Sequence, residues 1–215
     1  TLVNTNLVNA FAVPGCYVYI TRGLMAIVNS EAELASVLGH ELGHIAADHL
    51  EEQERRSFVR QLGVYAVALI TESEALTRIA SGAAELFSLR YSRRHEYEAD
   101  DFAIDLLVDV GYDPYAAADM LASLASYERF QQAGGPKLHA IPEWGRTHPL
   151  AENRVERVVD AARKSGIDRG ILPEREVVFM QELEGLLYGD DPSQGFVLGR
   201  QFAHPEMRIS FQVPQ

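Results

Sequence analysis

The ten residues that begin at His40 constrain this chain more than any other stretch. Residues 40–44 read His-Glu-Leu-Gly-His, which fits the pattern His-Glu-x-x-His. On a helix, His40 and His44 lie one turn apart and their imidazoles point the same way. Two neutral imidazoles and a third ligand from elsewhere fit a tetrahedral zinc ion with one open position. Glu41 lies about 100° round the helix, where it can reach a metal-bound water, so the stretch predicts a hydrolytic zinc site.

The sequence before this motif favours a helix. Ser30 is a good N-cap residue, and Glu33 three positions later completes a capping box. Apolar residues then recur at steps of three and four and give the helix one largely apolar face: Leu34, Val37, Leu38, Leu42 and Ile45. The alternative interpretation is a pair of packed, hydrogen-bonded histidines in a core. A third ligand decides between the two interpretations.

The third ligand has to come from a second helix. His49 stands five residues after His44, so on a continuous helix it points to another face. The extended motif with a glycine and a third histidine is absent, because Ala47 and Leu50 occupy those positions. No further ligand is therefore expected from the helix that carries the motif.

A second helix is predicted over residues 92–110, ended by Gly111. Glu96 and Asp100 are four residues apart and share one face of it. One carboxylate can then bind the metal while the other accepts the second N–H of a ligand histidine. The alternative is a solvated acidic face, which is the interpretation we favour for Glu98 and Asp101.

His95 is expected to have a structural role, because it points away from the face that carries the neighbouring glutamate. Strands are predicted at residues 8–13 and 17–20, around a Pro-Gly turn. An edge strand beside the zinc site could pair with an extended peptide, or the hairpin could simply pack on the helix. Further helices are expected at about residues 73–89, 114–131 and 149–164, with a long loop at 133–147 between the last two.

Composition excludes several classes. The net charge of -12 argues against sequence-independent nucleic-acid binding and against a polybasic membrane anchor. The single cysteine, Cys16, excludes an intramolecular disulfide and a cysteine-based zinc cluster. The longest apolar run, residues 62–70, is about half of what a bilayer crossing needs. The chain starts at Thr1, and we expect a processed or trimmed piece of a longer protein.

With these motifs together, the chain resembles the gluzincin zinc metallopeptidases of the HtpX, BepA and CAAX prenyl protease family. The resemblance covers about residues 4–165. It rests on the two separated helix motifs and on three further segments: Asn-Ala-Phe-Ala-Val-Pro-Gly at 9–15, Thr-Arg-Gly-Leu at 21–24, and Thr-His-Pro at 147–149 with an arginine at 154.

The resemblance implies a role for each matching residue. It implies one zinc ion per chain, held by His40, His44 and Glu96, with Glu41 as general base and Asp100 behind a ligand histidine. It also implies that Asn9 and Ala10 align the substrate backbone, and that His148 and Arg154 lie over the cleft, where either could steady an oxyanion. Whether His148 caps the zinc at rest or acts only in the transition state stays open. Cys16 departs from the family, whose members have a glycine there.

The implied fold is α+β and mostly helical, a zincin-type catalytic domain with a small N-terminal β-hairpin and an active-site helix pair. We expect this metallopeptidase domain at 1–188 and a short β-rich C-terminal extension at 189–215. The implied activity is a zinc endopeptidase acting on extended or misfolded polypeptides. The lack of spans favours the soluble BepA-like branch and a periplasmic location. The alternative is a chaperone-like protein-binding module with a self-blocked zinc site; a catalytically silent zinc domain is disfavoured because it needs no general base such as Glu41.

Overall fold

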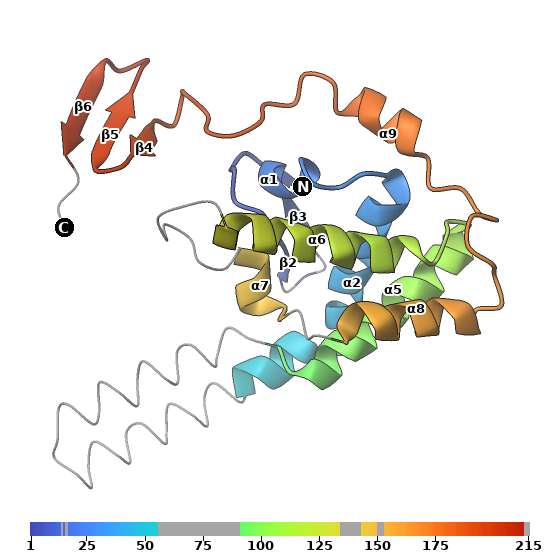
Figure 1. The fold of residues 1–215 in the computed structure, drawn as a ribbon. Helices are drawn as coiled ribbons and strands as arrows, with labels where there is room; N and C mark the ends of the chain where they lie inside the picture. The colour runs from blue at the N-terminus through green and yellow to red at the C-terminus, as the bar shows by residue number, and fades with distance from the viewer. Residues whose placement is uncertain (14, 16, 56–90, 134–142, 150–152, 213–215) are drawn as a thin grey trace, which may run out of the picture.

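The fold, taken from a computed structural model, is mostly helical with two small β-sheets, which confirms the predicted fold class (Figure 1). The structure describes residues 1–13, 15, 17–55, 91–133, 143–149 and 153–212. Its elements are β1 (Leu2–Val3), β2 (Ala10–Val13), β3 (Tyr17–Thr21), α1 (Arg22–Met25), α2 (Glu31–Ala46), α5 (Arg93–Val110), α6 (Ala116–Ala133), α7 (Glu143–Thr147), α8 (Arg154–Lys164), α9 (Glu176–Glu182), β4 (Phe196–Leu198), β5 (Gln201–His204) and β6 (Ile209–Gln212). Cys16, the apolar run at 62–70 and the helix expected at 73–89 lie outside the described residues.

The N-terminal sheet has the strand order β1-β3-β2, so β2 lies at one edge. β2 and β3 form the predicted antiparallel hairpin, with Ala10 opposite Ile20. The turn between them includes Gly15 at φ +93, a conformation that favours glycine. β2 packs against α2, which places the free edge of the sheet beside the helix of the motif.

Helix α2 begins where the sequence predicts. The Ser30 hydroxyl accepts a hydrogen bond from the Glu33 N–H at 3.0 Å. In return, the Glu33 carboxylate accepts the Asn29 N–H at 2.8 Å, one residue before the cap. These bonds satisfy orphan donors at the helix start. The helix that carries His40 and His44 is therefore fixed at its N-terminus by local sequence.

Two glycines allow α2 to lie very close to α5. A Cβ atom at Gly43 would stand 2.9 Å from the Cα of Ala99, and one at Gly39 would stand 3.1 Å from the Cα of Ala103. Distances this short leave no room for a side chain. The backbones of the two helices therefore meet at these positions, on either side of the turn that carries the first histidine.

The core lies between α2, α5, α6 and α8 and the inner face of the N-terminal sheet. Its larger buried apolar side chains are Val8, Leu24, Val37, Ile104, Leu107, Met120, Leu121, Leu124, Trp144 and Val158. Helix α6 starts two residues after the predicted position, and α8 starts five residues after it. These differences are in element ends, which sequence patterns define least well.

Helix α7 corrects the prediction of a continuous loop at 133–147, since residues 143–147 form one short helix. Tertiary contacts explain it. The Trp144 side chain is buried in the core, and the backbone N–H of Trp144 donates to the carbonyl of Val8 at 3.2 Å. A five-residue helix has too little periodicity to be recognised in sequence.

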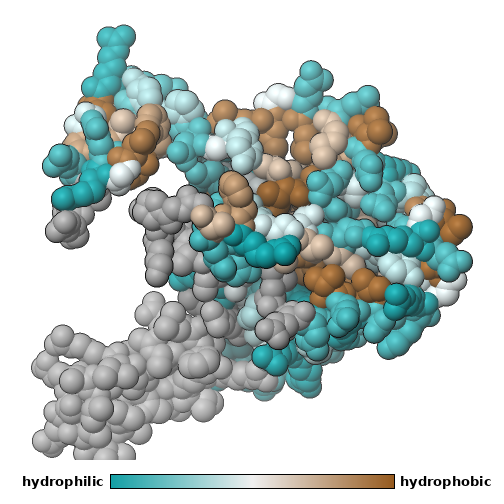
Figure 2. Space-filling model, in the orientation of Figure 1, coloured by the Kyte–Doolittle hydropathy of each residue, from teal (hydrophilic) through white to brown (hydrophobic). Residues whose placement is uncertain are grey.

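The C-terminal sheet, in the order β4-β5-β6, lies apart from the helices at the end of an extended segment (Figure 1). Its strands expose apolar side chains, with Leu198 71% and Phe211 54% accessible (Figure 2). Before it, the Arg22 guanidinium donates to the carbonyls of Leu187 and Gly189 and ties this segment to the N-terminal sheet. The division of the chain at residue 189 stays a prediction. Among the described helices, none combines the length and apolar character needed to cross a bilayer.

Candidate metal centre

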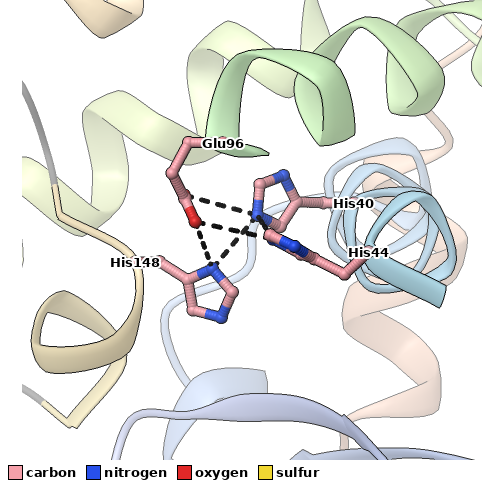
Figure 3. Close-up of side chains that lie close together, drawn as sticks. All are labelled: His40, His44, Glu96 and His148. Atoms are coloured by element: carbon pink, nitrogen blue, oxygen red, sulfur yellow. Dashed lines mark hydrogen bonds and ion pairs between the residues drawn. The ribbon is translucent and has the colours of Figure 1, made fainter. Parts of the chain in front are cut away.

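Four buried side chains converge between α2, α5 and the end of α7 (Figure 3). His40 and His44 come from α2, Glu96 comes from the first turn of α5, and His148 follows α7 directly. One donor atom from each lies within 4.8 Å of the others. None of the four residues is more than 4% exposed. The predicted ligand residues are therefore brought together, and His148 joins them.

The spacing of the donor atoms fits one tetrahedral ion. Nε2 of His40 lies 3.1 Å from Nε2 of His44 and 3.2 Å from Nδ1 of His148. The Glu96 carboxylate lies 3.1 Å from His148 Nδ1, 3.5 Å from His44 Nε2 and 3.6 Å from His40 Nε2. Four ligands at roughly 2.0–2.1 Å from a zinc ion stand about 3.4 Å apart. The donor set thus has the size of a metal coordination shell.

The hydrogen bonds of the two α2 histidines leave their Nε2 lone pairs facing each other, which favours a cation between them. Nδ1 of His40 lies 3.0 Å from Oδ1 of Asp100, so this nitrogen carries the proton and Nε2 has the lone pair. Nδ1 of His44 lies 3.0 Å from Nδ1 of His49, which leaves its Nε2 facing that of His40. Two bare lone pairs at 3.1 Å repel each other unless a proton or metal ion lies between them.

The pKa values of these groups fit the same requirement. Burial alone would lower the pKa of His40, but hydrogen bonds to Asp100 and Glu96 raise it to about 9. Burial lowers the pKa of His44 to about 2. Burial alone would raise the pKa of Glu96, but His148 and Arg154 hold it well below its usual range. The carboxylates around His40 thus favour a positive charge at this position.

Arg154 lies behind the ligands, although the sequence predicted it over the cleft. Its Nε and Nη2 donate to the two oxygens of Asp100 at 2.9 and 2.8 Å. Its Nη1 lies 2.5 Å from Oε2 of Glu96, and the side chain is 1% exposed. Burial alone would raise the pKa of Asp100, but Arg154 and His40 lower it to about 2. Arg154 thus fixes two carboxylates and is placed to position them.

Glu41 is buried beside the four converging side chains. Its Oε1 lies 3.4 Å from Nε2 of His148 and makes no hydrogen bond that meets the usual geometry within the described ranges. His148 itself stacks on Trp144, with ring centroids 4.3 Å apart. The Glu41 carboxylate therefore lies next to the converging donors, on the side of His148.

Sequence reasoning missed three residues around this centre. The Tyr91 ring stacks on His44 with centroids 3.8 Å apart, and Trp144 packs against His148. Neither aromatic residue belongs to a recognisable pattern. His49 was expected on another face of a continuous helix, but Asp48 has φ +53 and breaks the helix. This turn carries His49 back to the outer nitrogen of His44.

The other predicted residues lie as follows. His95 stays outside the converging group and contacts Glu52, with 2.8 Å between Nε2 and Oε2. Asp101 is an exposed partner of Arg157. Glu98 is half-exposed, but its carboxylate lies 3.4 Å from Nε2 of His49, a contact that the interpretation as a solvated face did not include.

Asn9 and Ala10 lie on the N-terminal sheet and are not part of the converging group. The Asn9 N–H donates to the Thr21 hydroxyl at 3.0 Å, and its carbonyl accepts the Thr21 N–H at 3.0 Å. Ala10 is fully buried at the start of β2. Their connection to the centre runs through α2, against which β2 packs.

Comparison with known proteins agrees with this geometry. Residues 1–162 match the model of peptidase family M48. The chain is 32% identical over 163 residues to the beta-barrel assembly-enhancing protease of Yersinia pestis, covering 72% of this chain and 32% of that protein. It is 33% identical over 172 residues to the putative beta-barrel assembly-enhancing protease of Vibrio cholerae, covering 76% and 34%.

A third relative comes from a plant. The chain is 31% identical over 161 residues to the mitochondrial metalloendopeptidase OMA1 of Arabidopsis thaliana, covering 74% of this chain and 30% of that protein. The chain thus spans about a third of the length of these relatives. The match over residues 1–162 shows that this chain belongs to peptidase family M48, a family of metalloproteases, as the resemblance predicted.

Proposed function

We propose that this chain is the catalytic domain of a zinc-dependent endopeptidase. The observation that carries the proposal is the buried set of donors at tetrahedral spacing, with Glu41 next to it. His40, His44 and Glu96 would hold the ion, because two imidazoles and one carboxylate are the ligands of many hydrolytic zinc sites. A bound zinc ion would act as a Lewis acid toward water and a peptide carbonyl.

The protein's own residues supply the proton transfers. Glu41 accepts the proton of the attacking water and then delivers it to the leaving amine. Asp100 holds the His40 ring through Nδ1, and Arg154 fixes Asp100 and Glu96 in turn. We therefore propose Arg154 as a positioning residue, because its guanidinium nitrogens already face these carboxylates. An oxyanion donor in the cleft is then better sought in His148.

An extended polypeptide is the proposed substrate, paired with the edge strand β2. Asn9 already uses its backbone N–H and C=O toward Thr21. Because these groups alternate in direction along an antiparallel strand, those of Ala10 point away from β3, toward the free edge. Ala10 is fully buried, so we propose that a substrate backbone bonds it only after the residues that cover this edge move aside.

A second candidate function is a protein-binding, chaperone-like module whose zinc site is usually closed. The observation that favours it is the position of His148, whose Nδ1 lies 3.2 Å from His40 Nε2 and 3.1 Å from Glu96 Oε1. A fourth protein ligand gives the closed coordination of structural zinc sites. We propose that His148 caps the ion at rest and moves away when substrate binds, which is a shift between two populations.

The substitution Glu41→Gln tests the enzymatic proposal. It keeps the shape of the side chain and removes the base, so the zinc content should stay at one per chain. Cleavage of an unstructured polypeptide such as casein should fall by about a thousandfold or more. Full cleavage by metal-loaded Glu41→Gln would remove Glu41 from the mechanism. The chaperone-like alternative would be favoured if the wild type and the His148→Ala variant both hold zinc but neither cleaves the polypeptide.

The setting of the activity is also a proposal. We infer a periplasmic protein that acts on misfolded polypeptides and binds no nucleic acid. The sequence resemblance supports this location, and two relatives are named for enhancing β-barrel assembly. The net charge of -12 disfavours binding to nucleic-acid phosphates. Cell fractionation of the natural host with an antibody to this chain would test the location.

A further inference from the structure

His44 is held from outside by a second buried histidine. Its Nδ1 lies 3.0 Å from Nδ1 of His49, whose side chain is 2% exposed. The Nε2 of His49 lies 3.4 Å from Oε2 of Glu98. A continuous line therefore runs from the group of converging donors through two imidazoles to a carboxylate at the surface.

Counting protons along this line gives each bond a direction. The Nε2 of His44 faces the other donors and must carry a lone pair to bind a metal, so Nδ1 carries the proton. His49 Nδ1 must then be the acceptor, because two N–H groups cannot share one hydrogen bond. The proton of neutral His49 is left on Nε2, the atom that faces the Glu98 carboxylate.

The surroundings of His49 fix its ring in this orientation. Asp48, at φ +53, turns the chain after α2 so that His49 lies beside His44. The His95 ring stacks on His49 with centroids 4.1 Å apart and an interplanar angle of 17°. His95 is in turn bonded to Glu52 at 2.8 Å. The acceptor that faces His44 is therefore part of a packed stack.

We propose that His49 is a positioning residue, which holds His44 in the tautomer that binds metal, with Glu98 orienting His49 from the surface. The inference rests on the proposed function, because it assumes a metal ion on His44. Outer partners of ligand histidines fix ring orientation and tautomer, and their loss weakens metal binding about 10- to 100-fold.

Two substitutions at His49 separate the hydrogen bond from the packing. His49→Phe keeps a ring on the His95 stack and removes the acceptor. His49→Asn restores an acceptor, since its amide oxygen can take the place of Nδ1. Zn²⁺ affinity of the purified full chain is measured by competition with a chromophoric chelator. We expect His49→Phe to bind about 10- to 100-fold more weakly, and His49→Asn to recover most of that loss.

His95→Phe is the matched control, because it changes the other ring of the same stack and leaves the His44 bond intact. It should bind Zn²⁺ as the wild type does. Equal affinity of His49→Phe and wild type would overturn the inference, as would equal losses in His49→Phe and His49→Asn or in His49→Phe and His95→Phe. In each of these cases wild type still binds one zinc ion, so the proposed function stands. Wild type without zinc affinity would overturn both.

A surface variant keeps the inference testable if His49→Phe does not fold. Glu98→Ala changes a half-exposed side chain and removes only the outer end of the line. We expect about threefold weaker Zn²⁺ binding, because an exposed charge acts weakly. Asp109→Ala is the charge-matched control on the same helix and should have no effect. Equal affinity of Glu98→Ala and Asp109→Ala would overturn the role given to Glu98.

Discussion

The two histidines of α2 are supported in different ways. His40 donates to Asp100, a buried carboxylate that two nitrogens of Arg154 fix, and these two residues form the Asp100 arm. His44 contacts His49, a neutral imidazole that reaches half-exposed Glu98, and these two form the His49 arm. One arm is thus charged and buried, while the other is neutral and ends at the surface.

This difference assigns unequal tasks to the two arms. A buried charged hydrogen bond is strong, and breaking it leaves an unpaired charge in the interior. A neutral bond that ends at water is weaker and more easily replaced. We therefore expect the Asp100 arm to determine both stability and metal affinity, and the His49 arm to adjust metal affinity alone.

The largest expected effect comes from removing Glu96, which neither arm can replace. Glu96→Ala leaves two imidazoles and His148, and the buried Arg154 loses one of its two carboxylates. Metal content of the purified protein, measured by atomic absorption, should fall from one per chain to near zero. Glu98→Ala, two residues further on, should keep its zinc. The opposite result would show that the ligand register on α5 is wrong.

The next effect concerns Arg154, the charged end of the Asp100 arm. Arg154→Met removes the cation that Glu96 and Asp100 share and leaves two buried carboxylates in the metal-free protein. We expect the free energy of unfolding to drop by about 3–5 kcal/mol. Added zinc should recover part of the loss, because a bound divalent ion would lie next to Glu96. Urea denaturation with and without zinc measures both quantities.

Arg163→Met provides the control for this experiment. Arg163 lies on the same helix and pairs with Asp160 at the surface. An exposed pair contributes little to stability, so this variant should unfold as the wild type does with or without zinc. If Arg154→Met were equally harmless, the Asp100 arm would not be the stabilising one.

A third effect compares the carboxylate of each arm, Asp100 and Glu98, by its influence on Zn²⁺ affinity. Asp100→Asn keeps the shape of the side chain but removes the charge that accepts the His40 N–H. Zn²⁺ binding should weaken about 10- to 100-fold, well beyond the threefold loss expected for Glu98→Ala. Competition with a chelator measures both variants under the same conditions. Losses of similar size in Asp100→Asn and Glu98→Ala would contradict the ranking of these two carboxylates.

The two arms also differ in how far the sequence could predict them. Asp100, the inner residue of the Asp100 arm, follows from helical spacing, since Glu96 and Asp100 stand four residues apart on a helix with recognisable ends. The His49 arm depends on one backbone angle, φ +53 at Asp48, which turns the chain just after α2 ends at Ala46. Spacing counted along a continuous helix sends His49 to the wrong face. A non-glycine residue with positive φ is harder to recognise in a sequence than a glycine with positive φ.

Other features depend on tertiary contacts. The N-cap of α2 and the hairpin of β2 and β3 were predicted because local bonds determine them. The burial of Arg154 and the helix around Trp144 were not, because each depends on partners more than forty residues away. Local interactions are visible in a sequence, whereas the direction of a side chain in a packed core is not.

The last effect on metal affinity is a small one and is expected at His148, which belongs to neither arm. Its ring stacks on Trp144, and its Nε2 faces Glu41 at 3.4 Å. If His148 caps the ion only at rest, His40, His44 and Glu96 remain as ligands in His148→Ala. Zn²⁺ affinity should then fall only a few-fold. Small hydroxamate inhibitors should reach the metal more easily, with a lower inhibition constant or faster binding.

Trp144→Phe sharpens this last prediction, because it keeps a stacking ring under His148 while reducing the contact area. A cap held by stacking should open more often in this variant, so inhibitor access should lie between wild type and His148→Ala while zinc affinity is unchanged. A role for His148 in the transition state alone predicts another pattern: cleavage falls in His148→Ala, and inhibitor access does not change. A loss of zinc as large as that of Asp100→Asn would instead make His148 a permanent ligand. His148 would then matter as much for zinc binding as His40 and His44, and the distinction between histidines backed by an arm and one without an arm would fail.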